Sequence, residues 1–268
     1  MRSLAGFVFA ALSLFLVSSA FAEEEFPWEL FLPAIISGGN SLTCEDIAGC
    51  YSGDFADNCA GYSAQGKMNV SIKENCSVTI VSSYGVTSSG SITKRNGGTY
   101  SGTGNTGSNG CGSFSFTAID KGSSISVNYR YNNGKTGALP SGVSGYCKSE
   151  NRLRTEMLAG TWRFSYYIGD SYYDDTFAFK IGTITTAPGY SDVYTITGTN
   201  EYGSKVYGGY SPDIGYYEVL YPWEYLTGYT GYYKFSLTNY NKASGCYFLL
   251  NPYFQYNLCY PLTGTKIK

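Results

Sequence analysis

For acid–base chemistry the chain offers carboxylates and no histidine. Without His, the Ser-His-Asp and Cys-His nucleophile systems, His general bases and His metal ligands are excluded. Beyond the Glu23-Glu24-Glu25 run, acidic residues lie close together in three places: Glu45 with Asp46, Asp54 with Asp57, and Asp170 with Asp174 and Asp175. A glycosidase would need two acids that face each other across a groove. These acids instead lie in predicted turns, where Asp accepts hydrogen bonds from nearby backbone groups, so we expect no enzyme activity.

Two short segments share the composition of known ligand motifs but not their context. Residues 169–175 hold three Asp, yet they lack the regular ligand alternation of a calcium loop, and a hairpin turn is the simpler interpretation. Residues 102–107 match G-x-G-x-x-G, but no helix is predicted after them, which argues against a dinucleotide site. The absence of C-x-x-C spacing argues against zinc. We therefore expect no cofactor and no metal.

The eight Cys residues fall into an even number in each half of the chain. The second half holds Cys246 and Cys259, and the first half holds Cys44, Cys50, Cys59, Cys76, Cys111 and Cys147. Even numbers suit disulfides in an oxidising compartment, and each half can close its own bridges. Cys246 and Cys259 lie almost symmetrically about residues 251–254, which predicts a bridge across a hairpin. In the first half, proximity favours short bridges among Cys44, Cys50 and Cys59, although the pairing stays open.

Residues 1–22 have the pattern of a cleaved signal peptide. A short positive start at Met1-Arg2-Ser3 leads into an apolar run, and Ala20-Phe21-Ala22 forms a small-x-small cleavage site. A membrane anchor is the alternative, but it needs about 20 apolar residues, and the run is interrupted at Ser18-Ser19. We found no later stretch that is long and apolar enough to span a bilayer. We expect an exported protein that is periplasmic, at the cell surface or extracellular.

Charge and composition limit the kinds of partner. The formal net charge is −2 and no dense basic cluster occurs, so nucleic-acid binding is not expected. Only 14% of the residues are charged, whereas 28 are Tyr and 34 are Gly. The surface must therefore consist largely of hydroxyls, amides and aromatic edges. Such surfaces are common in exported β proteins and in proteins that meet sugars or other neutral polar ligands.

Residues 23–43 form an N-terminal arm with an apolar stretch at 26–36. Pro27 and Pro33 disfavour a long helix there. One interpretation is an extended arm, or a single helical turn, that docks on a neighbouring domain. The other is a peptide that plugs a cavity or contacts a partner or a membrane surface.

The chain contains two similar blocks. Ile47-Ala48-Gly49-Cys50-Tyr51 opens one and Leu158-Ala159-Gly160-Thr161-Trp162 opens the other. Residues 139–142 and 261–264 close them in a similar way. A self-similar period of this size indicates two copies of one small module.

Each block contains about eight short segments of alternating polarity at hairpin spacing, the last of them expected over 254–259. Closure into a barrel would remove the exposed edges of such a sheet. We predict an all-β protein of two tandem antiparallel up-and-down β-barrel-like domains, 44–148 and 155–268, joined by a linker at 149–154. A pair of β-sandwiches is the alternative.

The opening of the second block resembles the G-x-W motif of lipocalins and related calycin barrels. Gly160-Thr161-Trp162 follows a predicted helical turn and begins the first strand, as in those families. The resemblance implies that Trp162 closes one end of a barrel, that Lys266 packs on it and, more loosely, that a ligand cavity exists. The first block departs from the motif because it has Tyr51 in place of Trp, and the T-D-Y signature of lipocalins is not clearly present in either block.

Aromatic residues are dense in the second block and suggest a binding role. We expect an exported, non-enzymatic protein whose second barrel holds a small apolar or amphipathic ligand; the candidate binding residues are Tyr217, Tyr221, Trp223, Tyr225 and Tyr229. Tyr suits this role because it combines a large contact area with few rotatable bonds and a hydroxyl. One alternative is a carbohydrate- or surface-binding module with the same rings on an outer face. Another is a structural envelope or extracellular protein without a discrete site, in which the rings simply pack across strands.

Overall fold

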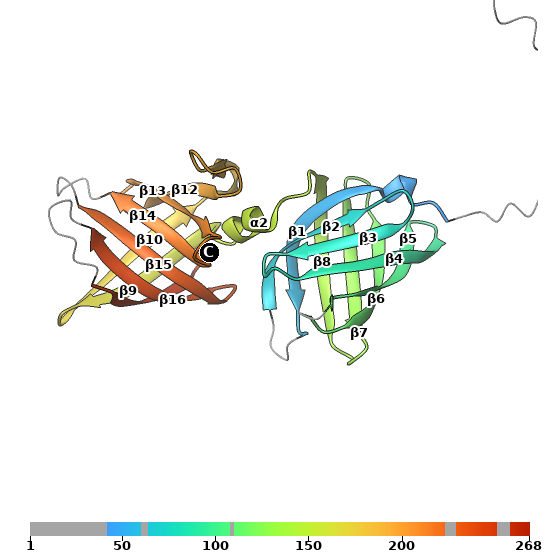
Figure 1. Cartoon of the computed structure of the whole chain (residues 1–268), viewed down its shortest axis with the longest axis horizontal. Coiled ribbons are helices and arrows are strands. Elements are labelled where there is room, and N and C mark those ends of the chain that lie inside the picture. The colour runs from blue at the N-terminus through green and yellow to red at the C-terminus, as the bar shows by residue number, and fades with distance from the viewer. Residues whose placement is uncertain (1–41, 60–63, 108–109, 223–228, 251–257) are drawn as a thin grey trace, which may run out of the picture. The chain divides into compact units, whose positions relative to one another are not determined.

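The computed structural model describes residues 42–59, 64–107, 110–222, 229–250 and 258–268. These residues form two closed antiparallel β-barrels, one before and one after a short helix in the chain (Figure 1). The prediction of two tandem up-and-down barrels is thus confirmed, and the sandwich alternative is wrong. The predicted signal peptide and the predicted arm at 23–43, with its apolar stretch at 26–36, lie almost wholly outside the described residues.

The first barrel consists of eight strands in chain order, each paired with the next. Its strands are β1 (Gly49–Asp57), β2 (Ala64–Ile72), β3 (Ser77–Ser82), β4 (Thr87–Asn96), β5 (Thr99–Asn105), β6 (Ser113–Asp120), β7 (Ser124–Tyr131) and β8 (Thr136–Gly145). The pairing of β8 with β1 closes the ring. Each strand overlaps one of the segments of alternating polarity, because the two-residue period that marks a half-buried strand recurs through the whole block.

The second barrel is also an up-and-down ring of eight strands, with one short strand added. Its strands are β9 (Gly160–Ile168), β10 (Ser171–Phe179), β12 (Tyr194–Asn200), β13 (Lys205–Ser211), β14 (Tyr216–Pro222), β15 (Thr230–Asn239), β16 (Lys242–Leu250) and β17 (Tyr260–Lys266). The added strand β11 (Thr185–Thr186) follows a 3-10 turn, η4 (Ile181–Thr183), and pairs only with β12. The last strand is β17, and most of the strand expected over 254–259 lies outside the described residues.

The repeated openers form the same interaction at one end of each barrel. In the first barrel, a 3-10 turn η2 (Glu45–Ile47) precedes β1, and the Tyr51 hydroxyl donates to the carbonyl of Ile47 at 3.1 Å. In the second barrel, Trp162 Nε1 donates to the carbonyl of Leu158 at 3.0 Å. All four side chains are buried. In each barrel, a short helical segment therefore covers one end. An aromatic side chain from the start of the first strand hydrogen-bonds to that segment and holds it in place.

Lys266 packs on Trp162, as the lipocalin resemblance implies. Residues Lys266 and Trp162 are directly opposite in the β17–β9 pairing, and the ammonium lies 5.6 Å from the indole centroid. Lys266 Nζ also donates to the carbonyl of Met157 at 3.0 Å. Burial is the main cause that lowers the pKa of Lys266 to about 8. Gly160 has a φ of +115°, and a Cβ there would lie 2.3 Å from the carbonyl oxygen of Lys268, so glycine is required beside this contact.

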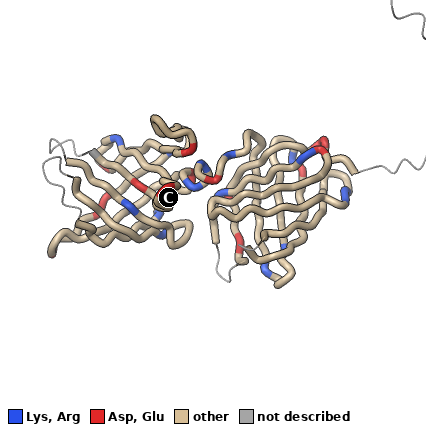
Figure 2. Tube along the Cα trace, viewed as in Figure 1, with Lys and Arg blue, Asp and Glu red and all other residues tan. Residues whose placement is uncertain are grey.

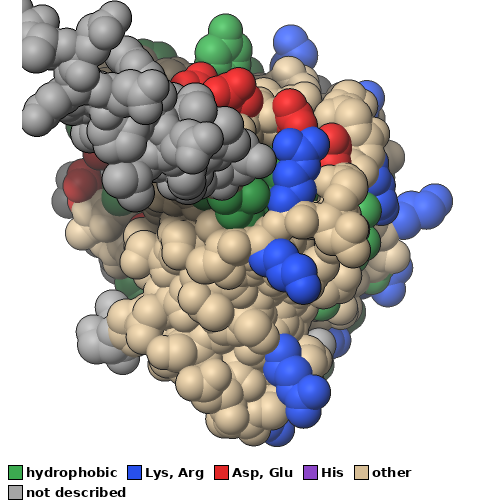
Figure 3. Space-filling model, turned by 90° about the vertical axis from the view of Figure 1, so that its right-hand side faces the viewer, with side chains coloured by type: hydrophobic (Ala, Val, Ile, Leu, Met, Phe, Trp, Pro, Cys, Tyr) green, Lys and Arg blue, Asp and Glu red, His purple; other side chains and the backbone are tan. Residues whose placement is uncertain are grey.

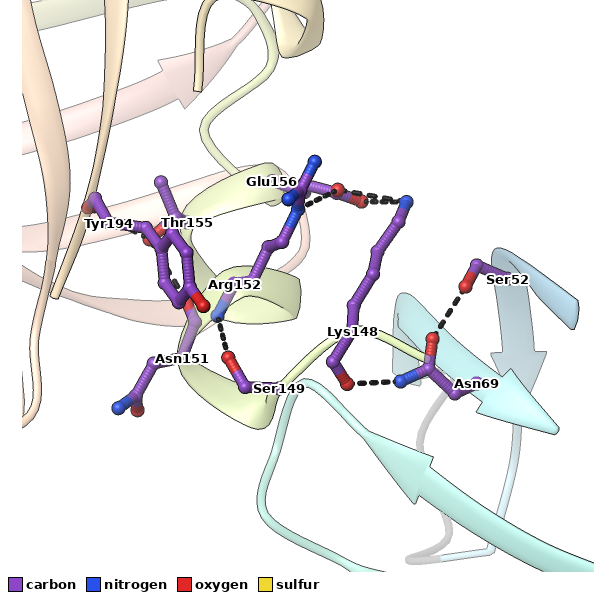
Figure 4. Close-up of polar contacts among 9 residues, drawn as sticks. All are labelled: Ser52, Asn69, Lys148, Ser149, Asn151, Arg152, Thr155, Glu156 and Tyr194. Carbon is purple, nitrogen blue, oxygen red and sulfur yellow. Dashed lines mark hydrogen bonds and ion pairs between the residues drawn. The ribbon is translucent and has the colours of Figure 1, made fainter. Parts of the chain in front are cut away.

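A helix occupies most of the segment that was expected to be a linker. Helix α2 (Glu150–Glu156) begins after Ser149, whose hydroxyl accepts a hydrogen bond from the backbone N–H of Arg152 (Figure 4). The buried Glu156 carboxylate lies 2.8 Å from Lys148 Nζ, and the Thr155 hydroxyl donates to the carbonyl of Tyr194 at 3.2 Å. Side-chain caps and ion pairs stabilise most of this helix. Its sequence therefore shows no apolar periodicity from which the helix could have been predicted.

The disulfides of the first barrel differ from the short bridges that proximity favoured. The described Cys residues form four bridges: Cys44–Cys76, Cys50–Cys147, Cys59–Cys111 and Cys246–Cys259. The last joins the expected pair, and no bridge crosses from one barrel to the other. The expected short bridges among Cys44, Cys50 and Cys59 are wrong. Cys44 and Cys50 lie near the start of β1 and Cys59 lies just after its end, and each is bridged to a cysteine that is distant in the sequence. Their partners come from segments that the barrel brings alongside.

Charges are sparse along both barrels (Figure 2). The face in Figure 3 consists mainly of uncharged polar side chains and backbone in its described part, as the composition suggested. Within the described part of the chain, no helix has both the length and the apolar character needed to cross a membrane.

We expect the Cys50–Cys147 bridge to stabilise the first barrel alone. It joins the segment just after β8 to the start of β1 across a separation of 97 residues, so its removal by Cys50→Ser with Cys147→Ser should cost the first barrel about 4–5 kcal/mol of unfolding free energy. Denaturant unfolding followed by far-UV circular dichroism measures this loss, and Trp162 fluorescence reports on the second barrel once Trp28 and Trp223 are replaced by Phe. An equal loss in the Trp162 transition would show that the barrels unfold as one unit. The matched control, Cys246→Ser with Cys259→Ser, should affect the second barrel instead.

Candidate binding site

A carboxylate inside the first barrel organises two tyrosines. Tyr51, Phe55 and Asp57 occupy inward positions of β1, so Asp57 reaches the interior from the last residue of the strand. Asp57 Oδ2 accepts hydrogen bonds from the hydroxyls of Tyr129 at 2.9 Å and Tyr131 at 2.8 Å, both on β7. Its Oδ1 accepts the backbone N–H of Cys59. The carboxylate is therefore held by three donors, each of them uncharged.

The two phenols that bind Asp57 stay protonated near neutral pH. Burial is the largest cause that raises the pKa of Tyr129, and the negative charge of Asp57 raises it further. For Tyr131, burial again comes first, followed by the hydrogen bond to Asp57. Both phenols are therefore fixed as hydrogen-bond donors, and they leave the negative charge of Asp57 unneutralised.

A cavity of about 210 Å³ lies beside this carboxylate. Its walls are mostly apolar or aromatic and come from inward residues of several strands and from loops between them. The described lining residues are Phe55, Asp57, Cys59, Ala64, Met68, Ile80, Ser82, Tyr84, Val86, Ser88, Thr106, Gly110, Phe114, Tyr129 and Tyr131. Of these, only Asp57 carries a charge. We call this hollow the first-barrel cavity.

The first-barrel cavity lies at the end of the barrel away from the η2 turn. Strand β1 starts beside that turn and ends at Asp57, and the loop residues Tyr84, Val86 and Thr106 join strand ends on the same side. Tyr84 is 37% exposed at this end, whereas Ile47 is fully buried at the other. The barrel is thus plugged at one end and hollow at the other.

Three rings form one wall of the cavity. The centroid of Phe114 lies 6.0 Å from that of Tyr129 and 5.8 Å from that of Tyr131, and the two tyrosine rings are 5.6 Å apart and nearly perpendicular. Gly137 lies opposite Tyr129 in the β7–β8 pairing. A Cβ on Gly137 would come within 2.3 Å of the Tyr129 ring, so only glycine lets this ring lie where it reaches Asp57.

The second barrel repeats the carboxylate arrangement from different strands. Asp175 on β10 accepts the hydroxyls of Tyr166 at 2.8 Å and Tyr233 at 2.6 Å. Around it the rings are tightly packed: Tyr166 and Tyr247 stack with centroids 3.9 Å apart, and Phe164 lies 4.9 Å from Phe235. Aromatic side chains therefore occupy the interior that a ligand would need.

The predicted ligand-binding residues fall into three situations. Tyr217 and Tyr221 lie on the inward face of β14 within the core of the second barrel. Tyr217 stacks on Phe235 with centroids 5.8 Å apart, and Tyr221 lies 5.9 Å from Phe177. Tyr229 is half-buried just before β15. Trp223 and Tyr225 lie outside the described residues. The structure thus gives Tyr217 and Tyr221 contacts in the packed core of the second barrel.

Asp57 and Asp175 are the polar interior residues that sequence reasoning missed. Both were assigned to turns because acids cluster around them in the sequence. The signal that could have found them is strand phase: Asp57 follows Phe55 by two positions, and Asp175 precedes Phe177 by two. Residues two apart on a strand share a face, so an inward Phe predicts an inward Asp.

The outer surface offers two further features. A broad open groove of about 710 Å³ crosses β5–β8 of the first barrel, where Ser101, Thr117, Asn128 and Arg130 contribute to its lining. On the second barrel, four residues directly opposite one another cross β13–β16; this outer aromatic row is Tyr207, Leu220, Tyr232 and Phe248. Tyr207 is 44% exposed and Leu220 is 42% exposed.

The described residues contain no group of three or more His, Cys, Asp or Glu side chains that could hold a metal ion. Comparison of the chain with models of protein families, with curated proteins and with solved structures gives no match.

The Asp57–tyrosine contacts should make the first barrel sensitive to alkali. Since the folded pKa of Tyr131 lies above its unfolded value of 10.0, the unfolded chain releases this proton first. The stabilisation is complete below pH 10.0 and falls as pH rises toward the folded pKa. Urea unfolding at several alkaline pH values should show this fall, and Tyr131→Phe should reduce it. Near neutral pH, Tyr131→Phe should cost about 1 kcal/mol, the usual net value of one hydrogen bond.

Tyr146→Phe is the control for this measurement, because Tyr146 is 97% exposed after β8. It should leave both the neutral stability and the alkaline slope unchanged. An alkaline slope that is the same in Tyr131→Phe as in the parent protein would contradict the assignment.

Proposed function

We propose that this is an exported, non-enzymatic protein that binds a small apolar or amphipathic molecule in the first-barrel cavity. The observation that carries the proposal is the combination of an apolar hollow with one convergent polar cluster, Asp57 with Tyr129 and Tyr131. Small-molecule sites are typically mostly apolar, with a few polar groups that fix orientation. The role is the one expected from the sequence, but its site moves from the second barrel to the first.

Size and wall chemistry define the ligand that fits. Sites for drug-sized molecules enclose about 300–1,000 Å³, so a cavity of about 210 Å³ suits a smaller molecule. Burial of about 200 Å² of apolar ligand surface would contribute about 5 kcal/mol before the costs of association. An affinity of about 0.1 mM or weaker is therefore the natural expectation.

The disulfides and the absence of free Cys among the described residues support export. All eight Cys residues are paired, and such bridges persist in oxidising compartments. The signal-peptide pattern of residues 1–22 is consistent with the same destination. We therefore place the protein outside the cytosol, in the periplasm, at the cell surface or in the extracellular space.

Two neighbouring serines on β4 provide a matched test of the cavity. Ser88 is buried and lines the cavity, whereas Ser89 is exposed on the outer face of the same strand. Ser88→Leu should fill the hollow with apolar atoms and weaken binding by at least about tenfold, roughly 1.4 kcal/mol; Ser89→Leu should leave it unchanged. Native mass spectrometry of the purified protein identifies carried molecules, and isothermal titration measures affinity. Equal affinity in both variants would place the ligand elsewhere.

The outer aromatic row favours a second candidate function, carbohydrate binding on the second barrel. Tyr232 and Phe248 lie with centroids 5.6 Å apart, and the row extends through Leu220 to Tyr207. Such a row offers an apolar platform for the faces of sugar rings, and Glu218, which accepts the Tyr232 hydroxyl, adds a polar group beside it. Rings of this kind supply contact area with few rotatable bonds.

Soluble glycans should therefore bind to a protein with an intact row and lose affinity in Tyr207→Ala. A loss of about tenfold would match the removal of one aromatic contact of ~1.4 kcal/mol. Tyr202→Ala is the matched control, since Tyr202 is 74% exposed in the turn after β12. Glycan-array binding that is equally weakened by Tyr202→Ala, or absent throughout, would remove this candidate.

A further inference from the structure

We propose that the ligand of the first-barrel cavity is a small organic ammonium ion with an apolar tail. The inference rests on the proposed function, because it names the chemical class bound at that same site. Three observations support it: an unneutralised carboxylate, a wall of aromatic rings around it, and apolar surface in the rest of the cavity.

Within the described part of the chain, Asp57 forms no ion pair, and the exposed Arg130 shares with it only the lining of the outer groove. The three hydrogen-bond donors to Asp57 are the Tyr129 hydroxyl, the Tyr131 hydroxyl and the Cys59 backbone N–H. Each satisfies a lone pair without adding positive charge. Among the described residues, the ion pairs do not include Asp57, and no other charged side chain lines the cavity. A half-buried anion in apolar surroundings favours a cation over an anion or a neutral molecule.

The rings beside Asp57 favour the same class of ligand. The faces of Tyr and Phe rings carry negative potential and attract ammonium groups that lie within about 6 Å. Tyr129 and Tyr131 donate their hydroxyl protons to a carboxylate, which makes their rings more electron-rich. Phe114 lies against both, and Phe55 with Tyr84 forms a second edge-to-face pair on the cavity wall, with centroids 6.2 Å apart.

The remainder of the cavity fits an aliphatic or aromatic tail. Met68, Ile80 and Val86 contribute apolar side chains to the lining, and the buried side chains of Ser82 and Ser88 are small. A ligand with its ammonium near Asp57 and its tail toward Met68 would satisfy the charge and bury apolar surface at once. A fatty acid would place a second carboxylate near Asp57 or bury its head among apolar side chains, and both are unfavourable.

Three probes of nearly equal size test the charge preference in the unaltered protein: n-hexylammonium, 1-hexanol and hexanoate. We expect n-hexylammonium to bind at least about tenfold more tightly than 1-hexanol, from the combined carboxylate and cation–π attraction, and hexanoate to bind most weakly. Ser88→Leu, measured in parallel, establishes whether each probe occupies the cavity. If 1-hexanol binds as tightly as n-hexylammonium and Ser88→Leu weakens both, the ammonium inference fails and the proposed function stands. If Ser88→Leu weakens the binding of none of the probes, the proposed function fails, and this inference fails with it.

Asp57→Asn tests whether the Asp57 carboxylate causes the preference for n-hexylammonium over 1-hexanol. Asn keeps an oxygen that can accept a hydrogen bond from Tyr131, but it removes the charge. The affinity for n-hexylammonium should therefore fall to that for 1-hexanol, whereas the affinity for 1-hexanol should change little. The matched control is Asp54→Asn on the same strand, where the carboxylate side chain is 65% exposed and pairs with Lys67; it should retain the preference. Tyr131→Phe keeps the aromatic ring and should also retain most of the preference for n-hexylammonium. A charge preference that persists in Asp57→Asn would overturn the assignment to this carboxylate.

Discussion

Closure of an eight-stranded barrel creates an interior that side chains must fill or leave as a cavity. The number of strands and their tilt set the diameter, so the two barrels of this chain present similar interiors to different sets of inward side chains. Six of the largest fully buried side chains in the described residues belong to the second barrel: Trp162, Tyr233, Tyr247, Phe164, Phe177 and Phe235. The first barrel uses smaller inward residues over much of its wall, including Val70, Ile80, Ser82 and Ser88. Its cavity follows from this difference in side-chain volume.

The inward carboxylates are a second consequence of closure. A charged group that points into a barrel must be hydrogen-bonded there, and phenols can supply those bonds while their rings fill space. Asp57 and Asp175 both use two tyrosines in this way, yet the tyrosines come from β7 in one barrel and from β9 and β15 in the other. The shared arrangement therefore reflects the same physical need, met separately in each barrel. In the second barrel the surrounding rings leave the carboxylate little free space, whereas in the first it adjoins a cavity.

Much of the architecture could be predicted from local pattern, because strand phase and turn residues are written along the chain. All eight strands of the first barrel overlap predicted segments, and the repeated openers mark the closed ends. The interior partners could not be predicted in this way. Which cysteine meets Cys50 depends on the β1–β8 pairing that closes the ring, and that contact joins the two ends of the block. The cavity depends on the sum of side-chain volumes around the ring, for which a run of Tyr in one strand is a poor guide: Tyr217 and Tyr221 became core residues because they share the inward phase of Val219.

Stability and binding place opposite demands on the first barrel. A hollow interior forfeits the packing that its neighbour in the chain obtains from large rings, and each missing contact lowers stability. Three of the four disulfides lie in this barrel, and they join residues 32, 97 and 52 positions apart. Such bridges stabilise by restricting the unfolded chain, with no need for a filled core. The distribution of the cysteines therefore offsets the cost of the cavity: the packed barrel needs one bridge, and the barrel that keeps an open interior is held by three.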